Sequence, residues 1–266
     1  MRQNIIILLC AISTSVFAID NNPTTNARSA SLGNAGASLI SSINPGANSL
    51  TPENSASIHY LNPYGIKELS TVSGHLFFHN KVLDFGAVVS RFGYDKFNET
   101  RFSASVSKRL SSRLSLGIRL NYYSLLMSSF EERKNIITFD IGFLAVPTPK
   151  LTIGFIAEHI LRTTYTTDRG EFELPMTLRF GANYQLTKEF LMVGEIAKAT
   201  DDDVLVKIGG ELLPIDDVAL RVGLMTNPMR PTFGVGYSPS RLSFDVTSVY
   251  HTVLGFHTQF SMAYKF

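Results

Sequence analysis

The chain has 266 residues, and its 24 basic and 22 acidic side chains leave a formal net charge of only +2. This balance is too even to indicate a protein that binds nucleic acid or an anionic surface through an excess of Lys and Arg. Charged residues make up only 17% of the chain. No window of about eighteen uncharged apolar residues occurs, so no transmembrane helix is predicted.

The first residues have the pattern of a secretory signal. Arg2 precedes a short apolar run, and the small residues Val16 and Ala18 predict cleavage after Ala18. Removal of residues 1–18 would also remove Cys10, which leaves no disulfide and no cysteine-ligated metal in the mature chain. Lipidation of Cys10 is the alternative, but only about five apolar residues precede it, against the 7–15 of a signal core.

Residues 19–53 differ in kind from the rest of the chain. They are rich in Asn, Ser, Gly, Ala and Pro and almost free of charge, as in "NNPTTNARSASLGNAGASLISSINPGANSLTPENS". Such a composition predicts a loop or a loosely packed segment.

From residue 54 onward, short runs of alternating apolar and polar residues are separated by Gly, Pro, Asn, Asp and Ser clusters, and no helical period of useful length occurs. Most of the runs approach the 9–11 residues that a tilted strand needs to cross a bilayer, whereas globular strands centre on about 5–6. The pattern predicts fourteen strands, at 54–62, 69–79, 82–92, 99–109, 114–126, 135–146, 151–160, 174–187, 190–200, 203–213, 218–226, 231–238, 241–250 and 256–266.

The connections between these strands sort by length. If the first strand runs outward, the connections "NPYGIK", "GYDKFN", "MSSFEERK" and "LRTTYTTDRGEFE" share one side, and "NK", "LSSR", "PTPK", "TKE", "PIDD" and "SPS" share the other. A short connection at Asp201 is the one exception. Bacterial outer-membrane barrels have an even strand number, short periplasmic turns and longer external loops, so the connections favour such a barrel.

The two faces of the strands support the same interpretation. In 114–122 and 136–143 apolar residues alternate with polar ones, and in 174–185 Leu174, Met176, Leu178, Phe180 and Tyr184 form the apolar face. A soluble sandwich would alternate too, but its wet face would carry abundant Lys and Glu. Here the polar parity is mostly Ser, Thr, Gly and Asn. We therefore predict an all-β fold, a 14-stranded antiparallel transmembrane β-barrel over 54–266 with a polar lumen, although the absence of Trp is unusual for membrane interfaces.

Isolated charges occupy the parity that faces the predicted lumen. Six acids and five bases are too evenly mixed for an ion-selective pore, so we interpret them as lumenal ion pairs, with a polar permeation path as the alternative. These residues are Asp84, Arg119, Asp140, Glu158, Arg179, Glu195, Lys207, Glu211, Arg221, Asp245 and Lys265.

The chain ends on an aromatic parity that includes Phe260, Tyr264 and Phe266. We expect this face to meet lipid in the closing strand and to serve as the C-terminal insertion signal for the barrel-insertion machinery.

The remaining reactive residues give no site. His75 and His79, the closest pair of the six histidines, would share a strand face without converging. No HExxH-type spacing or distinctive serine context occurs, so we expect no metal, no cofactor and no enzyme activity. The charged external loops, which include Glu131, Asp168 and Arg169, predict a solvated rim or a docking site for a partner protein.

The stretch "ARSASLGNAGASL" (27–39), followed by Asn44 and Pro45, resembles the PorV/PorQ-like branch of the FadL-type outer-membrane β-barrels common in Bacteroidota. Ala27, Arg28, Gly33 and Ala35 match the family pattern, but the later motif is "NPGA" and not Asn-Pro-Ala-Gly. The similarity covers nearly all of the mature chain. It implies fourteen strands and a plug-like N-terminal segment, residues 19–53, that can fold into the lumen.

The resemblance implies two functions. The first is an accessory or scaffold subunit of an outer-membrane complex such as a type IX-like secretion apparatus, and the alternative is a FadL-like channel for small hydrophobic molecules. The expected location is the outer membrane of a Gram-negative cell. Outer-membrane lipid, the insertion machinery and an outer-membrane protein are the expected partners, and nucleic acid is not.

Overall fold

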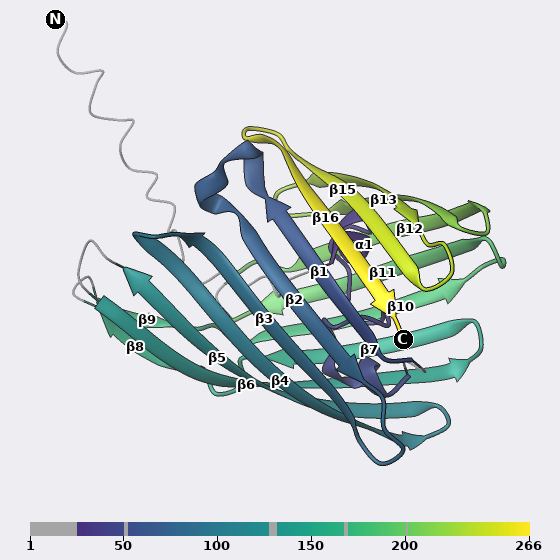
Figure 1. Ribbon diagram of the computed structural model, residues 1–266, viewed down its shortest axis with the longest axis horizontal. Coiled ribbons are helices and arrows are strands. Elements are labelled where there is room, and N and C mark those ends of the chain that lie inside the picture. The colour runs from purple at the N-terminus through teal and green to yellow at the C-terminus, as the bar shows by residue number, and fades with distance from the viewer. Residues whose placement is uncertain (1–25, 51–52, 128–131, 168–169, 201) are drawn as a thin grey trace, which may run out of the picture.

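The structure is a computed structural model that describes residues 26–50, 53–127, 132–167, 170–200 and 202–266 (Figure 1). The predicted signal, residues 1–18, lies outside the described residues. Fourteen of the described strands form a closed barrel, and each strand pairs antiparallel with its neighbours. The barrel closes where β1 pairs with β16, with Ser55 opposite Lys265. Closure pairs the backbone groups at every edge, which is what a sheet in hydrocarbon requires.

The strands of the barrel agree with the fourteen predicted spans. They are β1 (Ser55–Asn62), β2 (Thr71–Phe78), β3 (Asp84–Tyr94), β4 (Phe97–Ser111), β5 (Leu114–Met127), β6 (Glu132–Thr148), β7 (Leu151–Glu158), β10 (Thr177–Gln185), β11 (Phe190–Ala199), β12 (Leu205–Ile215), β13 (Val218–Met225), β14 (Arg230–Tyr237), β15 (Leu242–His251) and β16 (Gly255–Lys265).

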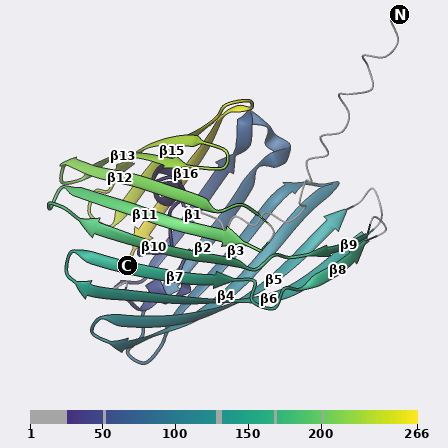
Figure 2. The same cartoon turned by 180° about the vertical axis from the view of Figure 1, so that it is seen from behind.

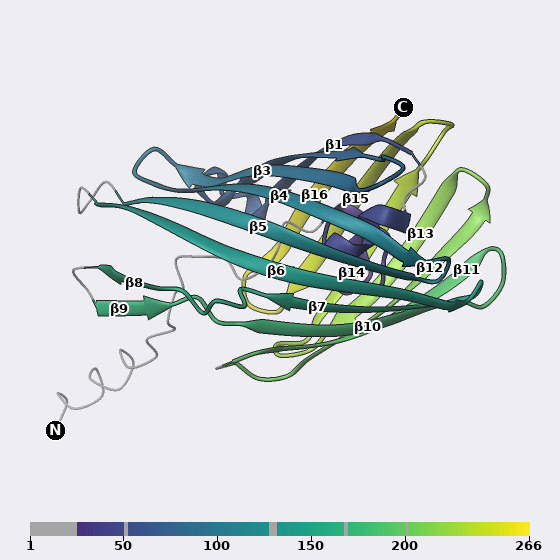
Figure 3. The same ribbon diagram turned by 90° about the horizontal axis from the view of Figure 1, so that it is seen from below.

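The connection between β7 and β10 contains more structure than the sequence predicted. β8 (Thr164–Thr167) pairs with β9 (Gly170–Glu173) as a separate hairpin, which Figure 3 shows beside the β5 and β6 ends. β10 begins at Thr177 and not at 174, because Pro175 has no N–H to donate to a sheet. Leu174, predicted on the apolar outer face, is instead buried inside the barrel, since the strand alternation does not extend to it.

The wall of the barrel is taller on one side. β4, β5 and β6 have 15, 14 and 17 residues, whereas β13 and β14 have 8 each. Figures 1 and 2 show β4, β5 and β6 running past the shorter strands toward the end with the β8–β9 hairpin. Longer strands at the end with the longer loops place extra wall on the predicted external side.

The two faces of the wall differ as the alternation predicts. Large apolar side chains on the outward parity, such as Ile118, Phe180 and Val222, are exposed, whereas Ser, Asn and charged side chains on the inward parity are buried. The aromatic residues of the predicted insertion signal, Phe260, Tyr264 and Phe266, are also exposed.

The helices of the described residues are short. α1 (Ala27–Ser31) and the 3₁₀ helix η1 (Pro45–Leu50) belong to the N-terminal segment, and η2 (Pro63–Gly65) and η3 (Lys67–Leu69) lie between β1 and β2. The side chain of Asn26 caps α1 by accepting the N–H of Ser29. Among these elements, no helix has the length and hydropathy that a membrane-spanning helix needs.

Candidate functional site

The N-terminal segment, residues 26–50, lies inside the barrel, where Figure 3 shows it surrounded by strands. α1 packs on β13 to β16, and η1 packs on β3 to β6. Between these ends the chain passes β12, β11, β10 and β7, so the segment follows the inner wall along most of its circumference. It is irregular, as predicted, but it is not loosely packed, because most of its residues are buried.

A ring of inward-facing glycines lets the segment lie directly on the wall. A Cβ on Gly209 would stand 2.7 Å from the Cα of Leu32, and a Cβ on Gly86 would stand 2.8 Å from Asn48 Nδ2. Such distances leave no room for a side chain, so the segment needs glycine beneath it. The ring consists of Gly86, Gly117, Gly142, Gly154, Gly181, Gly209, Gly223 and Gly234.

The segment has a glycine of its own where it closely approaches the wall. Gly33 has φ +70°, and a Cβ there would lie 2.6 Å from the carbonyl oxygens of Ile208 and Leu224. Both the conformation and the contact favour glycine at this position, which the sequence singled out by its motif.

Glu195 on β11 holds the middle of the segment. Its Oε2 atom accepts the backbone N–H groups of Gly36 (2.7 Å) and Ala37 (2.8 Å). Its Oε1 atom accepts hydrogen bonds from Arg179 Nε (2.7 Å) and Lys207 Nζ (2.9 Å). The carboxylate is fully buried, and two cations with two amide donors compensate for its loss of water.

Arg28 anchors the first turn of the segment. Its guanidinium makes a two-bonded pair with Glu211, with Nε to Oε2 at 2.9 Å and Nη2 to Oε1 at 2.7 Å. Burial alone would lower the pKa of Arg28, but the Glu211 carboxylate outweighs it and raises the pKa above the ordinary value. Glu211 also pairs with Arg221, which in turn pairs with Asp245 at 2.6 Å.

A third set of polar contacts holds the second half of the segment by its carbonyl groups. Arg119 pairs with Asp140 at 2.8 Å and donates through Nη1 to the carbonyl of Ser42. Asn183 Nδ2 donates to the carbonyl of Ser38 at 2.6 Å, and Arg109 donates to that of Ser49.

The predicted lumenal charges thus form ion pairs, and several of them also hold the segment, which sequence reasoning missed. Two lie apart from these networks, near the end of the barrel with the short turns. Asp84 pairs with His79, and the half-exposed Lys265 lies 3.4 Å from Glu53.

Apolar and charged side chains share the mouth of the lumen at the long-loop end. Tyr123, Leu125, Ile136 and Leu174 form a buried cluster, with Phe97 and Met127 packed against it. Along β5 this cluster lies beyond Arg119, farther from the short turns. Two buried charged residues of β4 lie at the same level. The guanidinium carbon of Arg101 is 6.0 Å from the centroid of the Tyr123 ring, and Glu99 lies opposite Leu125 in the strand register. An apolar solute that entered from this end would therefore meet hydrocarbon side chains beside these two charges.

A polar cavity of about 420 Å³ lies in the short-turn half of the lumen, between the segment and the strands on either side of the β1–β16 closure. Serine hydroxyl groups dominate its lining, with His59 and His75, whose ring centroids are 4.3 Å apart. His75 and His79 do not converge, and the described part of the chain contains no group of three or more His, Cys, Asp or Glu residues that could hold a metal ion.

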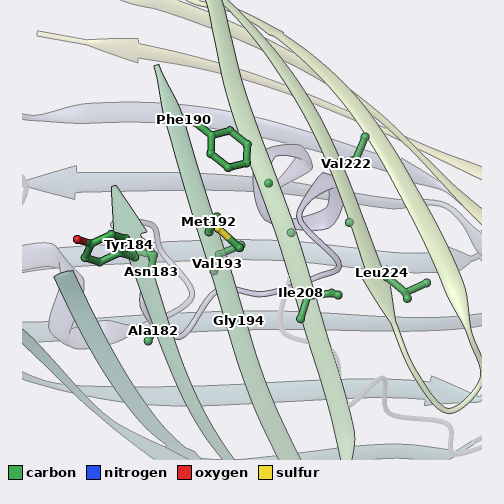
Figure 4. Close-up of a pocket in the computed structure, with 13 residues that line it drawn as sticks. Ala182, Asn183, Tyr184, Phe190, Met192, Val193, Gly194, Ile208, Val222 and Leu224 are labelled. Atoms are coloured by element: carbon green, nitrogen blue, oxygen red, sulfur yellow. The ribbon is translucent and has the colours of Figure 1, made fainter. Parts of the chain in front are cut away.

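The outer face has a hollow of its own. A space of about 750 Å³ opens on the outside of β10 to β13, and Figure 4 shows its lining. Ala182, Gly194 and Gly210 are the small outward residues of this surface. Larger apolar side chains surround them, namely Tyr184, Phe190, Met192, Ile208, Val222 and Leu224.

The structure brings the plug-like residues predicted from sequence into the lumen. Ala27, Gly33, Ala35, Asn44 and Pro45 are buried, and Arg28 lies in the polar cavity. Asn44 donates through Nδ2 to the carbonyl of Ala37 at 2.6 Å and accepts the N–H of Gly46 at 2.9 Å. Of the external-loop charges, Glu131, Asp168 and Arg169 lie outside the described residues.

No protein-family model matches the sequence, and no curated protein matches it significantly. The fold, however, is similar to solved structures. The Ralstonia pickettii toluene transporter TbuX superposes with a TM-score of 0.68 at 12% identity, over 93% of this chain and 100% of that chain. A Pseudomonas aeruginosa FadL homologue gives 0.63 at 13% identity, over 92% and 98%. The P. putida toluene transporter TodX gives 0.62 at 13%, over 91% and 98%.

The comparison establishes the architecture of the chain. It confirms the predicted all-β fold, a 14-stranded antiparallel transmembrane β-barrel like the FadL-type barrels, with the N-terminal segment in its lumen. The finer resemblance to the PorV/PorQ-like branch rests on the sequence motifs alone.

Proposed function

We propose that this chain is an outer-membrane channel for small hydrophobic molecules, closed by its N-terminal segment in the conformation described above. The observation that carries the proposal is a lumen that contains a segment seated on the wall, with a cluster of apolar side chains above it at the mouth. The likeness to the toluene transporters TbuX and TodX supports small aromatic hydrocarbons as the class of cargo. The proposal places the barrel in the outer membrane of a Gram-negative cell after cleavage near Ala18.

The geometry assigns a role to each layer of the lumen. The cluster around Tyr123 and Leu125 collects an apolar solute from outside. The charges around Glu195 and Arg119 hold the segment and leave an apolar solute no favourable contacts. Passage therefore requires the segment to leave part of the glycine ring, and this displacement is the gating step.

Fewer observations support the accessory-subunit hypothesis drawn from the sequence. Two of the three compared proteins are transporters by their printed names, and no observation on the described residues points to a secretion apparatus. Affinity purification at native expression is the check on this alternative. A stoichiometric protein companion would favour it over the channel.

Binding at the mouth can be measured with a single fluorophore, because the chain contains no tryptophan. Tyr123→Trp places the probe in the apolar cluster, and Tyr237→Trp places it on the outer face of β14, where Tyr237 is exposed. Titration with toluene should change the emission of Tyr123→Trp saturably, whereas the control should follow only the partition of toluene into the detergent. Identical curves would contradict a binding site at the mouth.

Transport requires a separate measurement in intact cells. Cells that express the barrel should take up labelled toluene faster than cells without it. Leu125→Gln, which puts an amide into the mouth, should remove this gain, while Leu186→Gln at an exposed short turn should keep it. Equal uptake with and without the barrel would overturn the proposal.

A further inference from the structure

The hollow on the outer face of β10 to β13 is not required by close packing, because larger side chains would fit at its two glycines. A Cβ built on Gly194 meets nothing within 4 Å, and the nearest atom to one on Gly210 is the Phe190 ring at 3.4 Å. Side chains could stand at both positions, as they do on the surrounding outer surface. Their absence leaves an apolar space of about 750 Å³, within the size range of ordinary small-molecule sites, about 300–1,000 Å³.

The wall behind this hollow is thin, and part of its lumen face packs against apolar side chains of the segment. Gly209 lies opposite Gly223, and Gly194 lies opposite Ile208 in the strand register. On the lumen side of the same strands, Leu32, Ala35 and Leu39 of the segment pack against Leu191 and Val193. An occupant of the hollow would therefore support the wall from outside, opposite the segment that supports it from inside.

Charged residues lie at the short-turn end of the hollow. Lys150 accepts the N–H of Gln185 at 2.8 Å, and Lys188 accepts its side-chain amide at 3.4 Å, both through their carbonyl groups. The backbones of the two turns that carry Lys150 and Lys188 thus meet at Gln185, the residue that follows Tyr184 of the hollow. Both lysines are exposed, and so is Glu189, the chain neighbour of Lys188.

We propose that the hollow binds one glycerophospholipid of the periplasmic leaflet, with an acyl chain in the hollow and the phosphate beside Lys150 and Lys188. The position on the bilayer-facing surface and the apolar lining select an acyl chain, and the two lysines supply a phosphate site at the water interface. The exposed carboxylate of Glu189, next to Lys188 in the chain, suits the ammonium group of a zwitterionic headgroup. The inference uses the membrane placement of the proposed function but not its transport activity, so the two can fail independently.

Filling the hollow tests the acyl-chain site. The double variant Gly194→Leu, Gly210→Leu occupies the space, and Gly74→Leu is its control, since Gly74 faces outward on β2 with nothing within 4 Å of an added Cβ. Native mass spectrometry of the barrel in mild detergent should show one phospholipid on the wild type and on Gly74→Leu, and none on the filled variant. Equal lipid on all three, or none on the wild type, would overturn the proposal.

The headgroup contact separates a phospholipid from a free fatty acid. Lys150→Glu, Lys188→Glu should reduce retention of phosphatidylethanolamine after delipidation and add-back at least tenfold, and should release the lipid from the native barrel. A native adduct with the mass of a fatty acid, unaffected by this double variant, would contradict the phosphate site.

A second measurement does not depend on the filled variant folding. Tyr184→Trp at the rim of the hollow, titrated with phosphatidylethanolamine that carries brominated acyl chains, should be quenched at about one lipid per barrel. Tyr237→Trp lies at a comparable distance from the short turns on β14 and should need many lipids. Identical quenching curves would show bulk lipid only and would overturn the site.

Discussion

Gly209 and Gly210 are neighbours on β12, and the space that each leaves is used differently. Gly209 faces the lumen, where Leu32 of the N-terminal segment lies against it, whereas Gly210 faces outward over an open hollow. Glycine therefore permits close backbone contact on the inner face, and it leaves an open hollow on the outer face. The residues of the inner face are therefore limited by contact with the N-terminal segment, whereas those of the outer face are limited by contact with hydrocarbon.

Removal of the Glu195 carboxylate should have the largest effect on the inner face. Glu195→Ala leaves Arg179 and Lys207 buried together without their shared acceptor and frees two segment N–H groups. We expect a loss of about 3–5 kcal/mol in the free energy of unfolding, the usual cost of breaking a buried ion pair. Urea titration in detergent, followed by the heat-modifiable gel shift, measures it.

The outer neighbour Ile196 on the same strand provides the control. Ile196→Ala removes an exposed apolar side chain, and lipid or detergent can fill the space. The urea midpoint of this variant should therefore move much less than that of Glu195→Ala. Glu195→Ala should also raise the ion conductance of the barrel in planar bilayers. A wild-type midpoint and conductance would mean that Glu195 does not hold the segment.

A charge on the outer face should have the next largest effect. Phe260→Arg places a guanidinium on the exposed face of β16, at a cost of about 2–4 kcal/mol if the site lies near the bilayer midplane. The folded fraction in membranes, read from the gel shift, should fall, while Phe260→Leu should remain near the wild type. Release of the wild-type protein by carbonate extraction would contradict the membrane placement itself.

The strands could be predicted from sequence because each depends on local information. The alternation around Leu114 to Tyr122 and the turn residues of "PTPK" and "SPS" identify a strand and its end without reference to distant residues. The β8–β9 hairpin was missed because its four-residue strands are too short for the alternation to be distinctive. Leu174 was placed on the wrong face because the strand period was extended past Pro175.

The site was predictable only in part, for a physical reason. Parity placed Glu195 and Glu211 inside the barrel, but their partners in the segment are 159 and 183 residues away in the chain, and no pattern gives that pairing. One signal was present and overlooked. Three pairs of the ring glycines lie directly opposite each other in register, Gly117 with Gly142, Gly154 with Gly181 and Gly209 with Gly223. Paired glycines on the lumen parity indicate that another backbone approaches the wall.

Replacement of one glycine on each face by alanine tests the same comparison with smaller expected changes in the free energy of unfolding. A Cβ on Gly117 would lie 2.7 Å from the N atom of Gly46, so Gly117→Ala must push the segment from the wall. Overpacking of this kind costs about 1–3 kcal/mol. Gly194→Ala adds the same methyl group in open space on the outer face. It should gain up to about 0.5–1 kcal/mol, because glycine within a strand is less favourable than alanine.

The smallest loss expected from removing a buried ion pair belongs to the first turn of the segment. Arg28→Ala removes two charge-assisted hydrogen bonds to Glu211. The side chain of Arg28 is 36% exposed, however, and Arg221 remains beside the same carboxylate. We expect a loss near the lower end of the 1.5–3 kcal/mol typical of hydrogen bonds to charged groups. Arg28→Lys should restore part of this loss, because an ammonium supplies the charge without the paired geometry.

The accessibility of introduced cysteines separates release of the segment from a general loss of stability. Ala30→Cys in α1 is buried in the wild type, so a water-soluble maleimide should label it faster in the Arg28→Ala background. A cysteine at Ser49, which η1 holds on the opposite side of the lumen, should keep its wild-type rate. Equal acceleration at both sites would mean that the segment moves as one body, and the distinction between its separately anchored ends would fail.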